Sequence, residues 1–254
     1  MCVASAEKLN DMYALLKLRA CNDYLPHGIV PGQFVQIEIP DSKTTFLRRP
    51  ISVNFADYSS GLLWLLVRKA GAGTAHLIEA KAGDVFNVIL PLGHGFDIPS
   101  AAGTHMLLVG GGVGVAPLLY LGKCLKEKGV DFDFALGART ASDLLELDEF
   151  SKYGKVYVST EDGSAGEKGF ITQHSIFSDG DITHIACCGP TPMMKAVAKI
   201  AKAHDIVCEV SLENVMACGL GACLCCIEDT KDGGNVCVCK EGPVFNINQL
   251  KWEL

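Results

Sequence analysis

A run of cysteines near the C-terminus constrains this chain more than any other feature of its sequence. The segment Met216-Ala-Cys-Gly-Leu-Gly-Ala-Cys-Leu-Cys-Cys226 has the spacing C-x4-C-x2-C, and Cys237 and Cys239 follow it. Thiolates on one tight loop converge only if the backbone turns back on itself, and Gly219 and Gly221 permit the positive φ that such a turn requires. The spacing therefore predicts a [2Fe–2S] cluster. Its first three ligands are expected to be Cys218, Cys223 and Cys226.

Two other roles for these cysteines have to be weighed. A cysteine outside a site is usually a small buried hydrophobe, and zinc is the stronger rival for the spaced set. Structural zinc sites pair two short C-x2-C knuckles, a pattern that C-x4-C-x2-C with a lone distant partner fits poorly. Two candidates for the fourth ligand lie in the second segment, Cys237 and Cys239. The residues alone leave the fourth ligand open between these two.

Composition limits the class of protein. The chain has 254 residues, a formal net charge of -7 and no basic stretch, which argues against nucleic acid, since such binding rests on clustered Lys and Arg. Six of its twelve cysteines fall between Cys218 and Cys239, and the start of the chain lacks the regions of a signal peptide. We therefore expect a cytoplasmic protein with reduced thiols. No apolar run reaches the ~18 residues of a membrane span, so no membrane partner is expected.

The sequence pattern divides the chain into three parts, a β part, an α/β part and a small module. Residues 1–100 contain short segments rich in β-formers between Pro-Gly, Ser-Ser-Gly and Ala-Gly-Asp turns, and they predict a small antiparallel β-barrel. Its strands are expected at 13–19, 34–39, 62–68 and 85–90. Residues 213–254 form a cysteine-rich module too small to hold a core without its metal.

Residues 101–212 alternate apolar strands with helical stretches, which is typical of a doubly wound parallel sheet. Strands are expected at 105–109, 132–137, 156–160, 182–188 and 207–212. Helices are expected at 116–128 and 191–203.

A glycine loop joins the first strand and the first helix of this α/β part. Leu107-Leu-Val-Gly-Gly-Gly-Val-Gly-Val-Ala-Pro117 places backbone amides at a helix start, where they can receive a pyrophosphate. The match to the common dinucleotide fingerprint is imperfect, because Pro117 stands where a third glycine is expected. A glycine turn without a ligand is the alternative. The predicted binding residues are Gly110, Gly111, Gly112, Gly114 and Pro117.

Two later turns contribute to the same expected NAD site. Cys188, Gly189 and Pro190 follow a strand at the carboxyl edge where such sheets bind ligands. Cys188 is expected near a nicotinamide, although a buried small residue is an equally good interpretation. Glu161 and Asp162 can accept hydrogen bonds from a ribose 2′-hydroxyl and repel a 2′-phosphate, which favours NAD over NADP, while a solvated acidic turn has the same sequence.

The barrel carries a second candidate nucleotide site. In Leu47-Arg-Arg-Pro-Ile-Ser-Val53 an arginine precedes a serine by three residues, and such groups on a strand can be aimed at an isoalloxazine or a phosphate. Lys69-Ala-Gly-Ala-Gly-Thr-Ala75 supplies a glycine-rich turn with the Thr74 hydroxyl. One chain therefore combines two expected nucleotide sites with a cluster.

The order of these motifs is more specific than any one of them. Together they resemble, over essentially the whole chain, the electron-transfer subunits of class B dihydroorotate dehydrogenase, in the ferredoxin reductase superfamily. The resemblance implies an FAD-binding β-barrel, an NAD-binding domain and a C-terminal [2Fe–2S] module. The motifs that carry it are Arg49-Pro-Ile-Ser52, Gly73-Thr74, Gly110 to Pro117, Cys188-Gly-Pro and Met216-Ala-Cys-Gly-Leu-Gly-Ala-Cys.

The resemblance also assigns residues to the cofactors. It implies that Cys239, just before Lys-Glu-Gly-Pro-Val-Phe, is the fourth cluster ligand, whereas Cys225 and Cys237 are extra cysteines that depart from the family pattern. It implies an FAD site lined by Arg49, Pro50, Ile51, Ser52, Leu66, Val67, Arg68, Gly73 and Thr74.

These cofactors imply an electron-transfer role without catalytic residues of its own. NADH gives two electrons as hydride and a cluster accepts one, while a flavin does both, so FAD is expected to link them. The resemblance implies that the next acceptor is the FMN of a catalytic dihydroorotate dehydrogenase subunit, in a heterotetramer with two copies of each, which forms orotate in pyrimidine biosynthesis. The alternatives are a ferredoxin-linked subunit of a bifurcating or hydrogenase-linked complex, a cluster-based redox sensor, and a zinc-stabilised binding module.

A partner subunit is expected to cover the cluster loop. Leu220, Leu224 and Val244 are apolar residues around the ligands that a partner could bury. The alternative is that they pack on the barrel of this chain.

Overall fold

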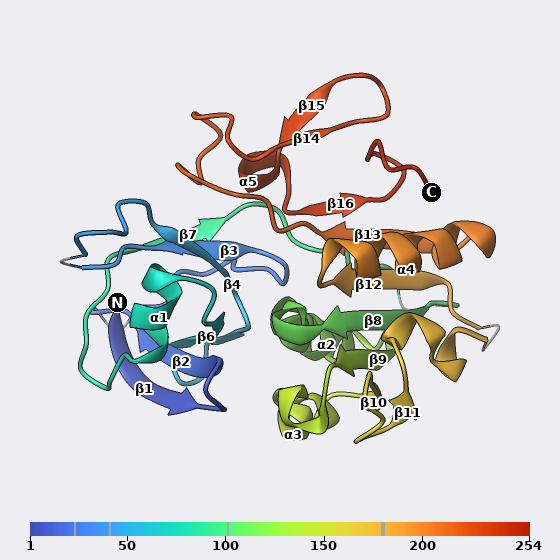
Figure 1. Cartoon of the computed structure of the whole chain (residues 1–254), viewed down its shortest axis with the longest axis horizontal. Coiled ribbons are helices and arrows are strands. Elements are labelled where there is room, and N and C mark those ends of the chain that lie inside the picture. The colour runs from blue at the N-terminus through green and yellow to red at the C-terminus, as the bar shows by residue number, and fades with distance from the viewer. Residues whose placement is uncertain (23, 41, 101, 179–180) are drawn as a thin grey trace.

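The computed structural model describes residues 1–22, 24–40, 42–100, 102–178 and 181–254. Figure 1 shows the N-terminal β part beside the α/β part, with the C-terminal module lying across both. Residue 101, at which the sequence places the first boundary, lies outside the described residues. Within the described ranges, no helix has the length and apolar character needed to cross a bilayer.

Residues 1–100 form two antiparallel sheets around one core, which confirms the antiparallel architecture. The first sheet contains β1 (Cys2–Lys8), β2 (Tyr13–Arg19), β6 (Leu62–Arg68) and β5 (Phe55–Asp57), in that order. The second contains β4 (Arg49–Ser52), β3 (Phe34–Ile37) and β7 (Val88–Leu92), in that order, and a short helix α1 (Ala72–Ile78) follows β6. The predictions of β2 and β6 are confirmed to the residue, whereas β1 and β5 were not predicted and β7 begins later than expected. β1 escaped prediction because it is a half-exposed strand of mostly small and polar residues.

The α/β part is built on a seven-stranded sheet with the order β11-β10-β9-β8-β12-β13-β16. Its strands are β8 (His105–Gly111), β9 (Asp131–Ala138), β10 (Lys155–Thr160), β11 (Glu167–Lys168), β12 (His184–Cys188), β13 (Val207–Ser211) and β16 (Val244–Asn246). All neighbours are parallel except the pair of β13 and β16. The chain moves outward from β8 in one direction and then returns to β12 on its other side. The strand order therefore reverses between β8 and β12, which is where such sheets bind ligands.

The two long helices begin and end where the sequence predicts. They are α2 (Ala116–Lys128) and α4 (Thr191–Ala203), each with a proline in its first turn. α2 ends at Gly129, whose φ of +69° provides the left-handed C-cap. The remaining helical segments are α3 (Leu147–Ser151) and the 3-10 turns η1 (Gly112–Val115), η2 (Ala141–Asp143), η3 (Ile171–Gln173) and η4 (Ser175–Ser178).

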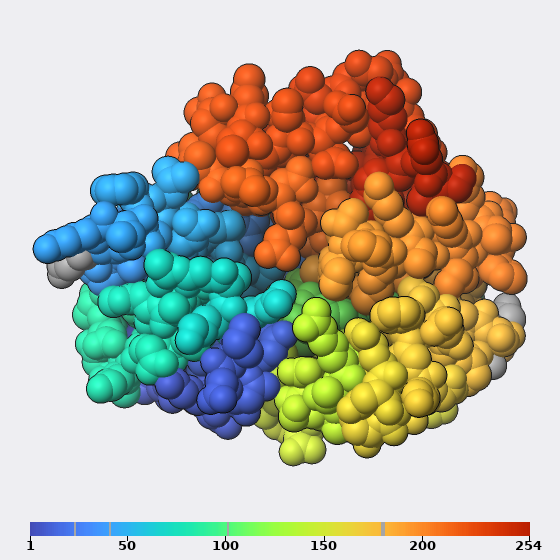
Figure 2. Space-filling model, viewed as in Figure 1, coloured from blue at the N-terminus to red at the C-terminus, as the bar shows by residue number. Residues whose placement is uncertain are grey.

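The cysteine-rich module is joined to both other parts. It contains the hairpin of β14 (Ile227–Asp229) and β15 (Asn235–Cys237) and the single turn α5 (Val238–Glu241). Its strand β16 extends the α/β sheet by pairing with β13. On the barrel side, the His94 N–H donates to the Gly242 carbonyl at 2.6 Å, and a Cβ on Gly93 would lie 2.6 Å from that oxygen. Figure 2 shows the module covering the junction between the other two parts.

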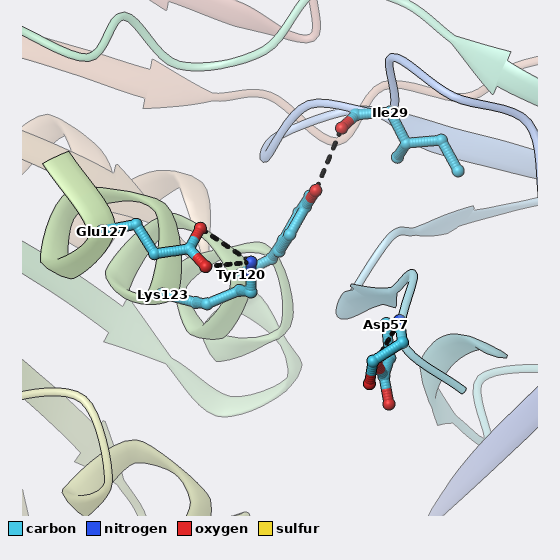
Figure 3. A network of polar contacts seen from close by, with 6 residues as sticks. Ile29, Asp57, Tyr120, Lys123 and Glu127 are labelled. Carbon is cyan, nitrogen blue, oxygen red and sulfur yellow. Dashed lines mark hydrogen bonds and ion pairs between the residues drawn. The ribbon is translucent and has the colours of Figure 1, made fainter. Parts of the chain in front are cut away.

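The barrel and the α/β part are held together through α2. The Tyr120 hydroxyl on this helix donates to the Ile29 carbonyl of a barrel loop at 3.2 Å (Figure 3). The Asn54 amide, just after β4, donates to the Ala116 carbonyl at 3.2 Å and to the Glu146 carboxylate at 3.0 Å. Burial raises the pKa of Glu146 to about 7. These polar contacts fix the side of the barrel that faces the glycine loop.

Candidate functional site

The cysteine loop turns back on itself as its sequence predicts. Gly219 and Gly221 have φ of +70° and +79°, and Leu224 also has a positive φ, +58°. Glycine adopts this backbone without a steric penalty, whereas a leucine held there is strained. The turn brings Cys218 and Cys226 into one loop over the barrel sheet of β3, β4 and β7 (Figure 1).

Backbone amides point at three of the four sulfurs that the sequence singles out. Leu220 N–H donates to Cys218 Sγ at 3.3 Å, and Gly221 N–H donates to Cys239 Sγ at 3.2 Å. The N–H of Cys239 in turn donates to Cys226 Sγ at 3.3 Å. The hydrogen bond from Leu220, followed by contacts with Cys223, lowers the pKa of Cys218 to about 6. Such donors stabilise thiolates, the form in which cysteine binds iron.

The four thiols of the predicted set lie near one another. Cys218 interacts with Cys223, and Cys239 interacts with both Cys226 and Cys218. Among the described residues, no three Cys, His, Asp or Glu side chains are grouped closely enough to hold a metal ion between them. The preference for a [2Fe–2S] cluster over zinc therefore rests on the cysteine spacing.

The two extra cysteines have different surroundings. The Sγ of Cys237 lies 3.9 Å from the carbonyl oxygen of Gly221, which is an acceptor and not a donor. Burial, and next the charge of Glu241, raises the pKa of Cys237. Cys225 is exposed to solvent. Among the described residues, neither side chain receives a backbone donor of the kind that reaches Cys218, Cys226 and Cys239.

In the barrel, Arg49 and Gly73 lie against each other. A Cβ on Gly73 would lie 2.7 Å from Arg49 Cδ, so the glycine allows the arginine to cross the start of α1. The Arg49 guanidinium reaches the Leu47 carbonyl only at 3.5 Å, the outer limit of a hydrogen bond. Guanidinium donors of this kind can form charge-assisted hydrogen bonds with an anionic group of a cofactor.

The other predicted flavin residues are placed less uniformly. The Thr74 hydroxyl accepts the N–H groups of Ala70 and Gly71 at 2.8 and 3.1 Å, so it caps α1. Ile51, Leu66 and Val67 are buried in the barrel core, and only their backbone can face a ligand. Pro50 and Ser52 are half-buried, as is Thr74, and Arg68 is exposed.

A cavity of 500 Å³ opens between the barrel and the carboxyl ends of the parallel strands. The residues predicted from sequence that line it are Arg68, Gly111, Gly112, Glu161 and Pro190. Residues that the sequence did not predict also line it, among them Tyr13, Arg139, Asp143, Phe170, Pro192 and Met193. Arg139 follows β9 directly, and its position at a carboxyl end is the signal that could have identified it.

Only part of the glycine loop faces this cavity. Gly112 has a φ of +55°, and a Cβ there would meet only Tyr13 Oη at 3.8 Å, so the space before it is open. A Cβ on Gly114 would lie 2.4 Å from the Cys188 carbonyl oxygen, so this glycine serves packing against the β12 end. Gly110 packs in the same way against Val115. Pro117 is buried in the first turn of α2.

Cys188 and Gly189, at the end of β12, pack against the glycine loop of residues 110–114. Burial, and next the charge of Glu213, raises the pKa of Cys188 to about 12, so its thiol stays neutral. A Cβ on Gly189 would lie 3.3 Å from the Cα of Gly111, so the two backbones pack closely here. The carboxylate of Asp162 accepts from Ser164 N–H and Oγ at 2.9 and 2.6 Å, and of the two predicted carboxylates Glu161 is the one that lines the cavity.

A larger cavity of 990 Å³ lies elsewhere, between residues 94–99, the β12–β13 edge of the sheet and the module. It contains His94, Asp97, His184 and Glu209 but none of the residues predicted to bind a cofactor. Cofactor chemistry is therefore assigned to the smaller cavity, where the glycine loop and the strand ends meet.

The apolar residues expected around the cluster separate into two kinds. Leu220 and Leu224 expose 57% and 60% of their surface. Val244 is buried, and its Cγ2 would lie 2.9 Å from a Cβ on Gly32 of the barrel. The prediction that Val244 is free for a partner is therefore wrong, because β16 packs it on this chain.

Comparisons with known proteins agree with this layout. The family model described as "Iron-sulfur cluster binding domain of dihydroorotate dehydrogenase B" matches residues 213–251, and "Oxidoreductase NAD-binding domain" matches residues 108–199. A protein of Caldanaerobacter subterraneus subsp. tengcongensis named "Dihydroorotate dehydrogenase B (NAD(+)), electron transfer subunit" is 41% identical over 87% of this chain and 85% of its own length. A protein of the same name from Bacillus velezensis is 38% identical over 93% of each chain.

Solved structures show the same fold. A chain from a structure titled "Insights into flavin-based electron bifurcation via the NADH-dependent reduced ferredoxin-NADP oxidoreductase structure" superposes with a TM-score of 0.87 at 30% identity, over 99% of this chain and 90% of that chain. An Amycolatopsis cytochrome P450 reductase superposes with a TM-score of 0.65 at 25% identity, over 80% of this chain and 66% of that chain.

Proposed function

This chain belongs to the family of electron transfer subunits of dihydroorotate dehydrogenase B, and we propose from this premise that its catalytic partner carries FMN and joins it in a heterotetramer with two copies of each. The chain passes electrons between NAD(H) and that partner through FAD and a [2Fe–2S] cluster. FAD supplies the exchange between two-electron hydride chemistry and one-electron chemistry of the cluster. The work of this chain is to hold these groups in place.

The proposed cluster ligands are Cys218, Cys223, Cys226 and Cys239. Support comes from the nearness of these thiols to one another and from the N–H donors on Cys218, Cys226 and Cys239. The carbonyl beside Cys237 disfavours it, because a carbonyl oxygen repels the negative charge of a ligand sulfur. The choice of Cys239 therefore rests on electrostatics as well as on sequence spacing.

The proposed FAD site lies along β4 and the start of α1. Arg49 supplies charge-assisted donors, and Gly73 allows its side chain to lie across the glycine turn. Pro50 and Ser52 follow Arg49 on β4, and their side chains lie on the opposite face of the strand from Arg49. The order of Arg49, Pro50 and Ser52 along β4 suits FAD, which has both a flat ring system and phosphates.

The proposed NAD site is the cavity between the barrel and the strand ends. Gly112 leaves open space for a pyrophosphate at the start of η1, and Pro190 lies across the cavity. Glu161 favours a ribose 2′-hydroxyl over a 2′-phosphate. Arg139 lines the same cavity and opposes that preference in part, so NAD selectivity depends on the carboxylate.

The observation that carries the proposal is the position of the proposed cluster cysteines against the barrel sheet that contains β4. It brings the proposed cluster beside the proposed flavin strand within one chain. The exposed Leu220 and Leu224 flank the cluster loop and give the partner an apolar surface to bury. All twelve cysteines are free, which supports a cytoplasmic location.

A second function has one observation in its favour. The structural neighbour whose title names electron bifurcation covers nearly the whole chain, so a ferredoxin-linked complex is the rival assignment. Co-purification with the dihydroorotate dehydrogenase catalytic subunit from the same cell, followed by an assay of dihydroorotate-dependent NAD reduction, separates the two. Activity that requires both subunits is expected. A failure to form the complex, together with ferredoxin reduction by NADH, would favour the rival.

A further inference from the structure

A glutamine on β3 lies between the proposed flavin strand and the cluster loop. β3 is the central strand of its sheet, and Gln36 pairs with Pro50 of β4. Side chains alternate along a strand, so Gln36 shares a face with Phe34, while the residues between and after them enter the barrel core. Phe34 packs in the same core as Cys239. Gln36 therefore faces the cysteine module.

The amide of Gln36 is completely buried and unpaired by the chain. Its exposed fraction is 0%, and neither Nε2 nor Oε1 has a hydrogen-bond partner among the residues that the structure describes. An unpaired buried amide group destabilises the folded state, because it loses its hydrogen bonds to water and gains none in the protein. Nearby Gln33 behaves differently, because its Nε2 donates to the Gly93 carbonyl at 2.8 Å and its Oε1 accepts the Val30 N–H at 2.9 Å. The Gln36 position would be more stable with an apolar residue unless a bound group meets the amide.

The Gln36 side chain touches the cluster loop directly. A Cβ built on Gly219 would lie 2.7 Å from Gln36 Nε2 and 2.8 Å from its Cγ, so only glycine lets the loop lie against this amide. Gly219 directly follows Cys218, the first proposed ligand. The amide nitrogen therefore lies beside the turn that presents this sulfur.

We propose that Gln36 is a positioning residue for the [2Fe–2S] cluster, with its Nε2–H donating a hydrogen bond to a sulfur on the Cys218 side of the site. This inference rests on the proposed ligand set. Hydrogen bonds to cluster sulfurs stabilise the added negative charge of the reduced state and so raise the reduction potential. The bond is strengthened here because the amide is shielded from water.

The test uses Gln36→Met, which keeps the length of the side chain and removes the donor. In an EPR-monitored redox titration of the purified holo-chain, the cluster potential is expected to become more negative, with the FAD potential and the iron content unchanged. A purely structural glutamine would leave the cluster potential of the holo-chain unchanged.

Gln33→Met is the matched control, because Gln33 belongs to the same segment and its amide is fully paired inside the chain. It is expected to lower the melting temperature and leave the cluster potential where it is. An equal shift of the cluster potential in both variants would overturn the proposal, because a non-specific loss of packing in this segment would then explain the shift.

Gln36→Leu provides a second variant in case Gln36→Met does not retain its cluster. Loss of the cluster from both, in chains that remain folded without it, supports the contact. A cluster potential that does not move in either variant, or a chain that fails to fold without the amide, overturns it. If a Cys218→Ala variant that keeps Gln36 retains its cluster, the proposed ligand set is wrong. Failure of the ligand set is therefore distinguishable from failure of the Gln36 proposal.

Discussion

At the scale of single residues, the cysteines give the sharpest test of the site. Replacing Cys223 or Cys239 by Ala should remove iron and the EPR signal of the reduced protein together, because each is a proposed ligand that no neighbouring cysteine can replace without a movement of the loop. Cys237→Ala and Cys225→Ala should retain both, since the Gly221 carbonyl lies beside Cys237 Sγ and Cys225 is exposed to solvent. Loss of the cluster in Cys237→Ala with retention in Cys239→Ala would reverse our assignment.

The adjacent arginines of the barrel offer a matched pair for the flavin site. Arg49→Ala should weaken FAD retention by about 1.5–3 kcal/mol, the contribution of a hydrogen bond to a charged group. Arg48 is already occupied by Glu38 at 2.7 Å and by the Asn87 carbonyl at 2.9 Å, so Arg48→Ala should have little effect. FAD content after gel filtration measures both, and equal FAD loss from the two variants would argue against a specific role for Arg49.

Glu161 decides nucleotide preference in the proposed NAD site. Glu161→Gln should lower kcat/KM for NADH by about tenfold and narrow the gap to NADPH, because the amide no longer repels a 2′-phosphate next to Arg139. Asp162→Asn should change neither value, since that carboxylate is used by Ser164. Steady-state reduction of ferricyanide by each nucleotide provides the measurement. An unchanged NADH to NADPH ratio in Glu161→Gln would remove this residue from the site.

Sequence alone predicted the residues that stand in local motifs and missed those that converge from several elements. Gly112 and Pro190 line the cavity as expected, because each ends or follows a buried strand. Arg139 and Phe170 come from separate loops with no motif of their own, and only the folded sheet brings them to the glycine loop. Gln36 was missed because no motif marks it and, in the sequence, it is an ordinary position within the strand β3.

At the scale of elements, the junction between β4 and α2 contains a buried acid. Burial raises the pKa of Glu146 to about 7 from its usual 4.5, so the folded chain binds a proton that the unfolded chain releases. The free energy of unfolding should therefore fall as pH rises from about 4.5 to 7 and level off above 7. Its contribution to that fall is about 1–3 kcal/mol.

Glu146→Gln tests this junction, because it keeps the acceptor for the Asn54 amide and removes the titration. Urea unfolding at pH 5 and pH 8 should show that the variant loses less stability between these values than the wild type. Glu127→Gln is the control, since its exposed pair with Lys123 on α2 (Figure 3) contributes little. Identical pH dependence in wild type and Glu146→Gln would show that the acid is solvated in the folded protein.

The helices and strands that the sequence predicted best are those with a long, regular pattern of apolar residues. Helices 116–128 and 191–203 match α2 and α4, since each combines a proline near its start with a long amphipathic pattern. The strand β16 was not predicted, because three residues give no period and its pairing with β13 joins segments far apart in sequence. Short edge strands of this kind become visible only once their partner is in place.

At the scale of the whole molecule, the three parts together form one electron-transfer path, and this path ends outside the chain. The predicted antiparallel and parallel sheets are confirmed, but their mutual packing was beyond sequence reasoning. The His94 bond to Gly242 and the pairing of β16 lock the module onto both other parts. The cluster loop projects from this frame with Leu220 and Leu224 exposed, which is the geometry of a subunit that hands electrons to another protein.

The whole-molecule prediction is that the chain is incomplete for dihydroorotate chemistry and docks through its cluster loop. Alone it should oxidise NADH with ferricyanide and show no dihydroorotate oxidation until the catalytic subunit is added. Leu220→Asp with Leu224→Asp should weaken the complex at least about tenfold by burying charge in an apolar contact, while NADH–ferricyanide activity stays unchanged. Val207→Asp, at an exposed apolar residue that starts β13, is the control and should leave affinity intact. Gel filtration and titration calorimetry with the catalytic subunit measure both, and undiminished affinity of the double variant would place the docking surface elsewhere.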